Sequence, residues 1–388
     1  MTESAIVCTD ESDSGAAGRS LGEQICAKMG GRPPDALILF VSPKYDAPAF
    51  LRAVERACPA GVMVGCSSAG EFTTTHYGQG SACAVGLRSP DMRFAAGIGR
   101  GVGGDRAAVA AQVTASFNGV GRFTGGYSSA LVLTDALAGH AEELIEQLTL
   151  LTKGAYQFFG GGAGDDANFR RTQVFLGTEV ASDAVVALEI LSTKPVGVGV
   201  RHGWTPAGAP LRVTEASGAR IVSLNAAPAV EAFADHAGRT GQAFDRSDPV
   251  PFFLHNILGI DTGDGFKLRV PLAIDAGGAV TCAAEIPAGS VVRIMATDSQ
   301  SAANAAAGAA RDAVARLNGE RPAVAIFFDC VATRLRMGKE FGFELRSVQD
   351  VLGEASFAGC NTYGQVARAE GQFSGFHNCT AVVCALPG

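Results

Sequence analysis

The stretch GCSSAGEF, Gly65 to Phe72, places a thiol, two hydroxyls and a carboxylate among small residues, directly after an apolar run. Cys66 is a candidate nucleophile, because a thiol reacts as its thiolate when a histidine or a positive charge lies close to it. His76 and His377 are candidate partners for such a cysteine. The same composition also fits a phosphate-binding glycine loop, or a tight turn that accepts only small residues.

Two further stretches match this one. The matched segments are GCSSAGE (Gly65–Glu71), GGGAGD (Gly160–Asp165) and GCNTYGQ (Gly359–Gln365), and we call them the three tips. Gly161 stands where the other tips have Cys66 and Cys360, so the turn itself does not need a thiol. Each tip ends in a polar residue, which leads us to expect that the three tips together line one pocket.

The tips belong to an internal repeat. Each tip follows an apolar strand and a helix-period stretch, and each precedes a further apolar strand. The leading segments of the three units, Ala5–Leu21, Arg93–Val113 and Arg293–Leu317, each read as a strand, a polar or glycine-rich turn and an alanine-rich helix. This pattern predicts an α/β protein with mixed sheets, built from pseudo-repeated β-α-β-α-β-β units.

The repeats also predict a division into two domains. We expect an N domain, residues 1–194, that holds two units. The expected C domain, residues 195–388, begins with an inserted α+β segment (195–287) of different character and ends with the third unit (288–388).

Composition excludes several classes of partner. The chain has 31 basic and 38 acidic residues and a net charge of -7, which is the opposite of the charge needed to follow nucleic-acid phosphates. It shows no export signal and no apolar stretch of the roughly 18 residues that cross a bilayer, so we expect a cytoplasmic protein. The ten cysteines include no C-x-x-C pair, which favours buried free thiols over zinc sites or disulfides.

Two cofactor patterns are present in weak form. Gly99, Gly101 and Gly104 form a G-x-G-x-x-G, but no strand ending in Asp or Glu follows where a ribose-binding carboxylate would lie. Haem needs an axial ligand in an apolar pocket, and His202 and His255 are the candidates. We expect no cofactor and keep noncovalent haem as the alternative.

The motifs together resemble the FIST family, sensory proteins in which a FIST N domain precedes a FIST C domain. The resemblance rests on GCSSAGEF, FFGGGAGDD, PVGVGVRHGWTPAG and GCNTYGQV, and it covers nearly the whole chain. Gln365 stands where the family usually has Glu. The resemblance implies small-ligand sensing, with amino acids as proposed ligands. Some members resemble nitric-oxide-responsive haem proteins that act on a histidine kinase.

We therefore expect a sensory protein, not an enzyme, that binds an amino acid or similar metabolite at the tips between the two domains and signals to a partner. Backbone N–H groups, hydroxyls and amides would bind the carboxylate, Glu71 or Asp165 the ammonium group, and aromatic rings would form the walls. The expected site residues are Gly65, Cys66, Ser67, Ser68, Gly70, Glu71, Gly161, Gly162, Asp165, His202, Trp204, Asn361, Thr362, Tyr363 and Gln365.

Two alternatives remain open from the sequence. One is a haem-based nitric oxide sensor that acts on a histidine kinase, with His202 or His255 on the iron. The other is a hydrolase with Cys66 or Cys360 as its nucleophile.

Overall fold

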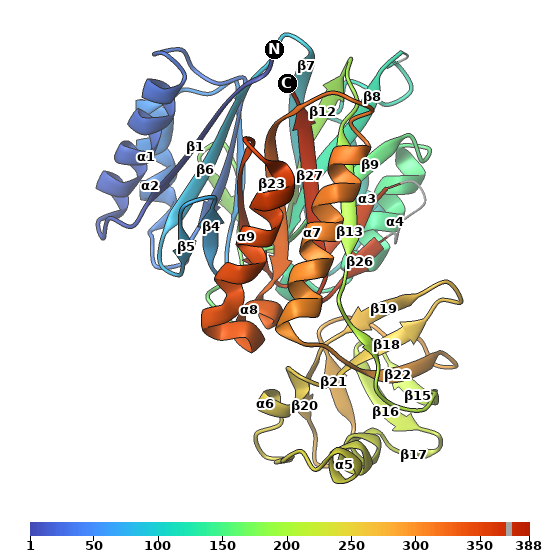
Figure 1. Cartoon of the computed structure of the whole chain (residues 1–388). Coiled ribbons are helices and arrows are strands. Elements are labelled where there is room, and N and C mark those ends of the chain that lie inside the picture. Colours follow the sequence, from blue (N-terminus) through green and yellow to red (C-terminus); the bar gives the residue numbers. More distant parts are fainter. Residues whose placement is uncertain (124, 370–374) are drawn as a thin grey trace.

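A computed structural model describes residues 1–123, 125–369 and 375–388 of the chain. Within these ranges the strands form three six-stranded mixed sheets and one nine-stranded antiparallel sheet. Figure 1 shows the six-stranded sheets in one body with helices on its outside, and the nine-stranded sheet in a smaller lobe below it. The α/β class with mixed sheets agrees with the sequence prediction. No helix of the described residues has the length and apolar character needed to cross a membrane.

The elements of the body fall into three sets. The first set is β1 (Glu3–Thr9), α1 (Ser14–Lys28), β2 (Ala36–Val41), α2 (Ala47–Ala57), β3 (Val62–Ser67), β4 (Glu71–Thr73), β5 (Tyr77–Gly78) and β6 (Ala82–Arg88). The second is β7 (Met92–Arg100), α3 (Arg106–Thr114), β8 (Tyr127–Thr134), η1 (Ala136–Ala138), α4 (Ala141–Leu151), β9 (Tyr156–Gly162), β10 (Val174–Leu176), β11 (Glu179–Ala181) and β12 (Ala184–Ser192). The third is β13 (Gly197–Arg201), α7 (Ser299–Ala315), β23 (Pro322–Cys330), α8 (Val331–Met337), η2 (Gly338–Glu340), α9 (Phe341–Leu352), β24 (Ser356–Thr362), β25 (Gln365–Arg368), β26 (Gly375–His377) and β27 (Ala381–Pro387).

The three sheets of the body share one strand order. In the first sheet β6 lies antiparallel between β1 and β2, and β2 lies parallel to β3. The corresponding orders are β7-β12-β8-β9 in the second sheet and β13-β27-β23-β24 in the third. Each sheet is completed by a short hairpin from another set: β10–β11 joins the first sheet, β25–β26 the second and β4–β5 the third. The three sets are therefore interlocked.

One common core lies between the sheets. Ile38, Leu133 and Ile326, one residue from each sheet, belong to the same buried apolar cluster. The opposite face of each sheet packs against its own pair of helices, α1 and α2, α3 and α4, or α7 and α9. Strands covered on both faces have to be apolar throughout, which explains continuous runs such as ALILFV in β2.

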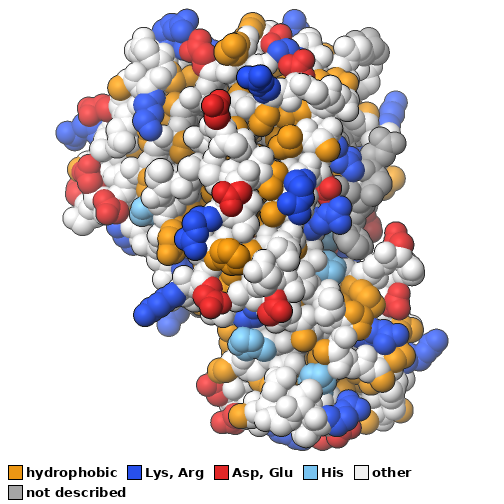
Figure 2. All heavy atoms as spheres, in the orientation of Figure 1, with side chains coloured by type: hydrophobic (Ala, Val, Ile, Leu, Met, Phe, Trp, Pro, Cys, Tyr) orange, Lys and Arg blue, Asp and Glu red, His pale blue; other side chains and the backbone are white. Residues whose placement is uncertain are grey.

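The lobe, residues 205–296, contains β14 (Thr205–Pro206), β15 (Leu211–Ser217), β16 (Arg220–Leu224), β17 (Ala227–Pro228), α5 (Ala229–Thr240), α6 (Val250–Phe253), β18 (Ile257–Asp261), β19 (Phe266–Arg269), β20 (Pro271–Ile274), β21 (Val280–Cys282) and β22 (Val291–Ala296). Figure 2 shows basic and acidic side chains interspersed over body and lobe, so the face in view presents no continuous basic surface.

The sequence assignment of the third leading strand was wrong. The segment Arg293–Thr297 overlaps β22, which pairs with β14, β15 and β18 inside the lobe. The position beside β27 is taken by β13 instead. The insertion therefore separates β13 from α7, and the stretch 195–287 includes one strand of the body.

The first position of each tip has to be a glycine, for the same physical reason in all three sets. A Cβ on Gly65 would lie 2.4 Å from the Leu39 carbonyl oxygen on the neighbouring strand. The corresponding distances are 2.0 Å from Gly160 to Val132 O and 1.7 Å from Gly359 to Phe327 O. Real Cβ atoms do not approach a backbone oxygen so closely, so only glycine fits these positions.

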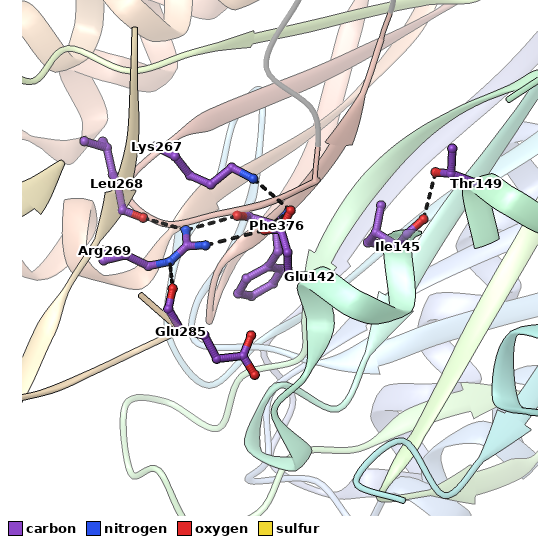
Figure 3. Close-up of polar contacts among 8 residues, drawn as sticks. All are labelled: Glu142, Ile145, Thr149, Lys267, Leu268, Arg269, Glu285 and Phe376. Carbon is purple, nitrogen blue, oxygen red and sulfur yellow. Dashed lines mark hydrogen bonds and ion pairs between the residues drawn. The ribbon is translucent and has the colours of Figure 1, made fainter. Parts of the chain in front are cut away.

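A buried charge cluster fastens the lobe to the body (Figure 3). The Arg269 side chain is 3% exposed, and its Nη1 donates to the carbonyl oxygens of Leu268 at 2.9 Å and Phe376 at 3.2 Å. Glu142, on α4, pairs with Arg269 Nη2 at 3.4 Å and with Lys267 Nζ at 2.8 Å. Burial lowers the pKa of Arg269, and the nearby Glu142 carboxylate opposes that effect. The Glu142 carboxylate thus compensates two positive charges of the lobe.

We predict that Gly359→Ala destabilises the protein by about 3 kcal/mol or more, because the new methyl group overlaps a backbone oxygen that cannot move freely. The matched control is Gly238→Ala in α5, where an added Cβ meets no atom within 4 Å. That control should gain about 0.5–1 kcal/mol, since alanine is the better helix residue. Urea unfolding measures both, and equal stability of the two variants would contradict the close-approach argument.

We predict that Glu142→Ala lowers the free energy of unfolding by about 2–3 kcal/mol, because it leaves buried Arg269 uncompensated. The control is Glu231→Ala, which removes a surface ion pair with Arg246 whose side chains are 51% and 45% exposed. This control should change stability by less than about 0.5 kcal/mol. Chemical denaturation of both variants distinguishes them, and a similar small loss in both would show that the cluster does not hold the lobe.

Candidate ligand-binding site

The three tips meet at the carboxyl ends of β3, β9 and β24. Backbone hydrogen bonds join each tip to the next: Gly164 N donates to Ser67 O at 2.9 Å, Ala69 N to Asn361 O at 2.9 Å, and Tyr363 N to Gly162 O at 3.0 Å. The carboxyl ends of strands are where open α/β sheets bind ligands. The N–H groups that bond the tips together are, however, not free to bind a carboxylate, which corrects that part of the expected site.

The polar side chains of the first two tips are also largely engaged. Ser67 Oγ accepts from Gln173 N at 2.9 Å, and Ser68 donates to Glu71. Asp165 accepts from Phe169 N at 2.8 Å, Arg170 N at 2.7 Å and Arg171 N at 2.8 Å, and also from the Tyr363 hydroxyl. With these four donors Asp165 anchors the following loop and has little capacity left for an ammonium group.

Glu71 and Gln365 occupy equivalent places in the first and third sets. Glu71 Oε2 accepts from Ser81 N at 3.0 Å, immediately before β6. Gln365 Oε1 accepts from Thr380 N at 3.2 Å, immediately before β27, and its Nε2 donates to Thr362 Oγ1 at 2.9 Å. Burial raises the pKa of the Glu71 carboxyl to about 7, although hydrogen bonds from Ser68 and Ser81 lower it. A neutral amide therefore does in one tip what a carboxyl does in the other.

The remaining expected residues lie in three different surroundings. Cys66 and Cys360 are fully buried in the common core, and burial raises the pKa of Cys360, which disfavours a thiolate. A Cβ on Gly161 would press against Thr362, and one on Gly162 would lie 2.9 Å from Tyr363 O. The His76 ring lies 3.2 Å from Ser81 Oγ.

His202 and Trp204 lie where the lobe joins the body. Trp204 belongs to a buried cluster with Met295 and Cys330. His202 Nε2 lies 3.0 Å from Phe266 O, and its Nδ1 accepts from Trp204 N at 3.3 Å. Both ring nitrogens of His202 are thus engaged. His255 is exposed, and the desolvation of its ring still lowers its pKa. No group of His, Cys, Asp and Glu among the described residues could hold a metal ion.

A cluster of unpartnered polar atoms lies beside Gly70. We call Asp166, Arg334 and Asn361 the polar cluster. Asn361 is 1% exposed, and neither its Oδ1 nor its Nδ2 has a hydrogen-bond partner. Asp166 Oδ1 and Arg334 Nε are also buried without partners. Such atoms cost free energy, so their concentration at one place indicates a missing polar partner.

Gly70 lies against two members of this cluster. Its backbone has a φ of 129°, and a Cβ there would lie 2.9 Å from Asn361 Oδ1 and 3.3 Å from Arg334 Cζ. Asn361 and Arg334 also line a pocket of about 360 Å³, together with Tyr77, Gly78, Gln79 and Phe341 among others. With its amide oxygen toward the guanidinium, Gln79 accepts from Arg334 Nη2 at 2.8 Å.

The charges of the cluster balance one another. Burial lowers the pKa of the Arg334 guanidinium, while the Asp166 and Glu71 carboxyls raise it. Burial raises the pKa of Asp166, against a hydrogen bond of 3.0 Å from Ser42 and the charge of Arg334. No ion pair of the described residues includes Arg334. The Arg334 guanidinium and the Asp166 carboxyl thus influence each other's pKa without forming an ion pair.

Sequence reasoning included Asn361 and Gly70 among the site residues but included neither Arg334 nor Asp166. A signal for Arg334 exists, because it lies in the first helix after the apolar strand AVAIFFDC, where α/β proteins place ligand-binding side chains. The glycines of the G-x-G-x-x-G pattern have a structural explanation. Gly99 makes room for α3, and the helix N-terminus is capped by the side chain of Asp105.

Comparison with known proteins identifies the family. The FIST N domain matches residues 35–227 and the FIST C domain matches residues 229–368. The chain belongs to the FIST family, whose domains are sensory domains that bind small ligands in signalling proteins. The expected domain boundary near residue 194 stays a prediction. No curated protein matches the chain.

Two solved structures align with the whole chain at 12% identity. One is phosphoribosylformylglycinamidine synthase II from Thermotoga maritima, with 72% of that chain covered and a TM-score of 0.23. The other is T. maritima PurL complexed with FGAR, with 73% covered and a TM-score of 0.24. Similarity of this size carries no argument about this chain.

We predict that the Glu71→Gln variant folds normally, because a glutamine, Gln365, already occupies the equivalent position of the third tip. We also predict that this variant differs from the wild type in how its stability depends on pH. The folded-state pKa near 7 lies above the usual 4.5, so the wild type binds an extra proton on folding between these values. Its stability should therefore fall relative to Glu71→Gln by on the order of 3 kcal/mol as pH rises from about 4.5 to 7. Urea unfolding across this range measures the difference, with exposed Glu55→Gln as control. Parallel curves for wild type and Glu71→Gln would contradict the assignment.

Proposed function

We propose that this protein is a sensor whose ligand is an α-amino acid or a similar small zwitterion, bound at the polar cluster. The observation that carries the proposal is the set of buried, unpartnered atoms on Asp166, Arg334 and Asn361. A ligand with a carboxylate and an ammonium group would satisfy all of them at once.

Each residue of the cluster has a complementary role. The Arg334 guanidinium presents a planar fork that suits a carboxylate. Asp166 Oδ1 accepts from an ammonium group, and its charge is not consumed by an ion pair with Arg334. Asn361 can both donate and accept, so its amide fits between the two ends of the ligand. Arg334 and Asn361 line a pocket of about 360 Å³, which is within the size range of small-molecule sites.

Signalling completes the proposal. A sensory domain acts through a second protein, and a histidine kinase is the candidate partner that the family resemblance suggests. We propose no catalytic activity, since the thiols expected to act as nucleophiles lie fully buried in the core.

We predict that one or more of the twenty amino acids raises the melting temperature, because a ligand that binds only the folded state stabilises it by mass action. For each active amino acid, the decarboxylated amine and the deaminated acid serve as controls. Both should bind at least about tenfold more weakly, since each leaves one charged group of the cluster unpaired. Binding of either analogue as tight as that of the amino acid would contradict the zwitterion proposal.

The variants that test the site are Asp166→Asn and Arg334→Gln. Asn tolerates the left-handed backbone at residue 166, where φ is 55°. Both variants should lose the ligand-induced shift. Asp183→Asn is the matched control, because Asp183 is exposed and also has a positive φ of 49°. Unchanged shifts in both cluster variants would place the ligand elsewhere. Under the haem alternative, haem-reconstituted protein would instead show a Soret band that His255→Ala or His202→Ala removes.

A further inference from the structure

A second cavity, of about 410 Å³, lies between the body and the lobe. Its wall on the body side includes Leu137, Phe169 and Leu335, and its wall on the lobe side includes Val250 and Leu272. It is distinct from the pocket of the polar cluster, with which it shares Leu335 among the lining residues. The buried side chains of Ala69, Val331 and Tyr363 pack together beside it.

Apolar side chains that elsewhere would be buried are exposed here. Leu137, Phe169, Val250 and Leu335 all line the cavity, and each is between 40% and 46% exposed. A gathering of large exposed apolar side chains in one concave place is typical of a ligand site. The Phe169 and Tyr363 rings are stacked with their centroids 4.4 Å apart, which adds an aromatic surface to the wall.

One buried polar atom in this wall has no partner. Asn378 is 1% exposed and lines the cavity, and its Oδ1 accepts no hydrogen bond. Its Nδ2 donates to His377 O at 3.3 Å. An apolar cavity with a single unsatisfied acceptor selects for a ligand that is mostly apolar and carries a donor.

We propose that this inter-domain cavity is a second binding site, for a small aromatic molecule that carries one hydrogen-bond donor. The aromatic ring packs against Phe169 and Tyr363, the donor pairs with Asn378 Oδ1, and the lobe covers the ligand. This site does not depend on the amino acid site proposed above.

The test uses indole, a planar aromatic molecule with one N–H, and 1-methylindole, which has nearly the same shape without the donor. Binding is followed by calorimetry on the full chain. We expect saturable binding of indole and about tenfold weaker binding of 1-methylindole, because the latter leaves Asn378 unpaired. Asn378→Leu should remove this preference between the two molecules.

Two variants fill the cavity from the lobe. Ala283→Phe starts from an exposed residue that lines the cavity, and Val250→Phe is a second variant in case the first folds poorly. Each should weaken indole binding at least about tenfold, while Ala276→Phe, at an exposed turn outside the cavity, should not change it. Asp166→Asn should leave indole binding within about twofold.

Several results would overturn the proposal. They are no saturable binding of indole up to its solubility limit, equal binding of indole and 1-methylindole by the wild type, or unchanged indole binding in both filled variants. Loss of indole binding in Asp166→Asn would show that the two cavities form one site, which also contradicts it.

Discussion

The arrangement of the body depends on the close approach of backbones at Gly65, Gly160 and Gly359. At each position the carbonyl oxygen of the neighbouring parallel strand occupies the space that a Cβ would need. Beyond each tip the chain leaves its own sheet and extends another, as β4, β10 and β25 do. Because this exchange runs around all three sets, the tips have to meet at one place, and the strands of the common core have to be apolar on both faces.

This junction also explains why most of its own polar groups are not part of the candidate site. A three-way meeting of chain segments buries many N–H and C=O groups, and buried backbone groups have to be paired. The backbone groups of the tips pair with one another, and Asp165 accepts hydrogen bonds from the loop that follows it. Glu71 and Gln365 accept hydrogen bonds from the residues that precede β6 and β27. Unsatisfied groups are left on Asn361, in the third tip, and where a side chain from another element enters the junction, as Arg334 does from α8.

The sequence predicted what depends on local pattern. The tips, the strands, the helices and the burial of Cys66 and Cys360 follow from small-residue motifs and apolar runs, which report on nearby structure. The sequence does not distinguish β13 from β22 as the leading strand of the third set, because both segments are apolar. Only the strand pairing shows that β13 lies beside β27 and that β22 lies beside β18 in the lobe. Asp166 and Arg334 were missed for the same reason. They are 168 residues apart, so no sequence window contains both, and a charged residue in isolation is most often solvated.

The two cavities are built on the same loop and the same helix. The loop after the second tip carries Asp166 to the polar cluster and Phe169 to the inter-domain cavity, and α8 carries Arg334 and Leu335 in the same way. Asp166, Ala167 and Phe169 all have positive φ, a conformation that such residues hold only when their surroundings impose it. A loop held in this way keeps its place when either cavity is filled, so the coupling between the two sites is expected to be small. Any change in affinity that results has to be reciprocal, because the coupling free energy between two binding sites is the same in both directions.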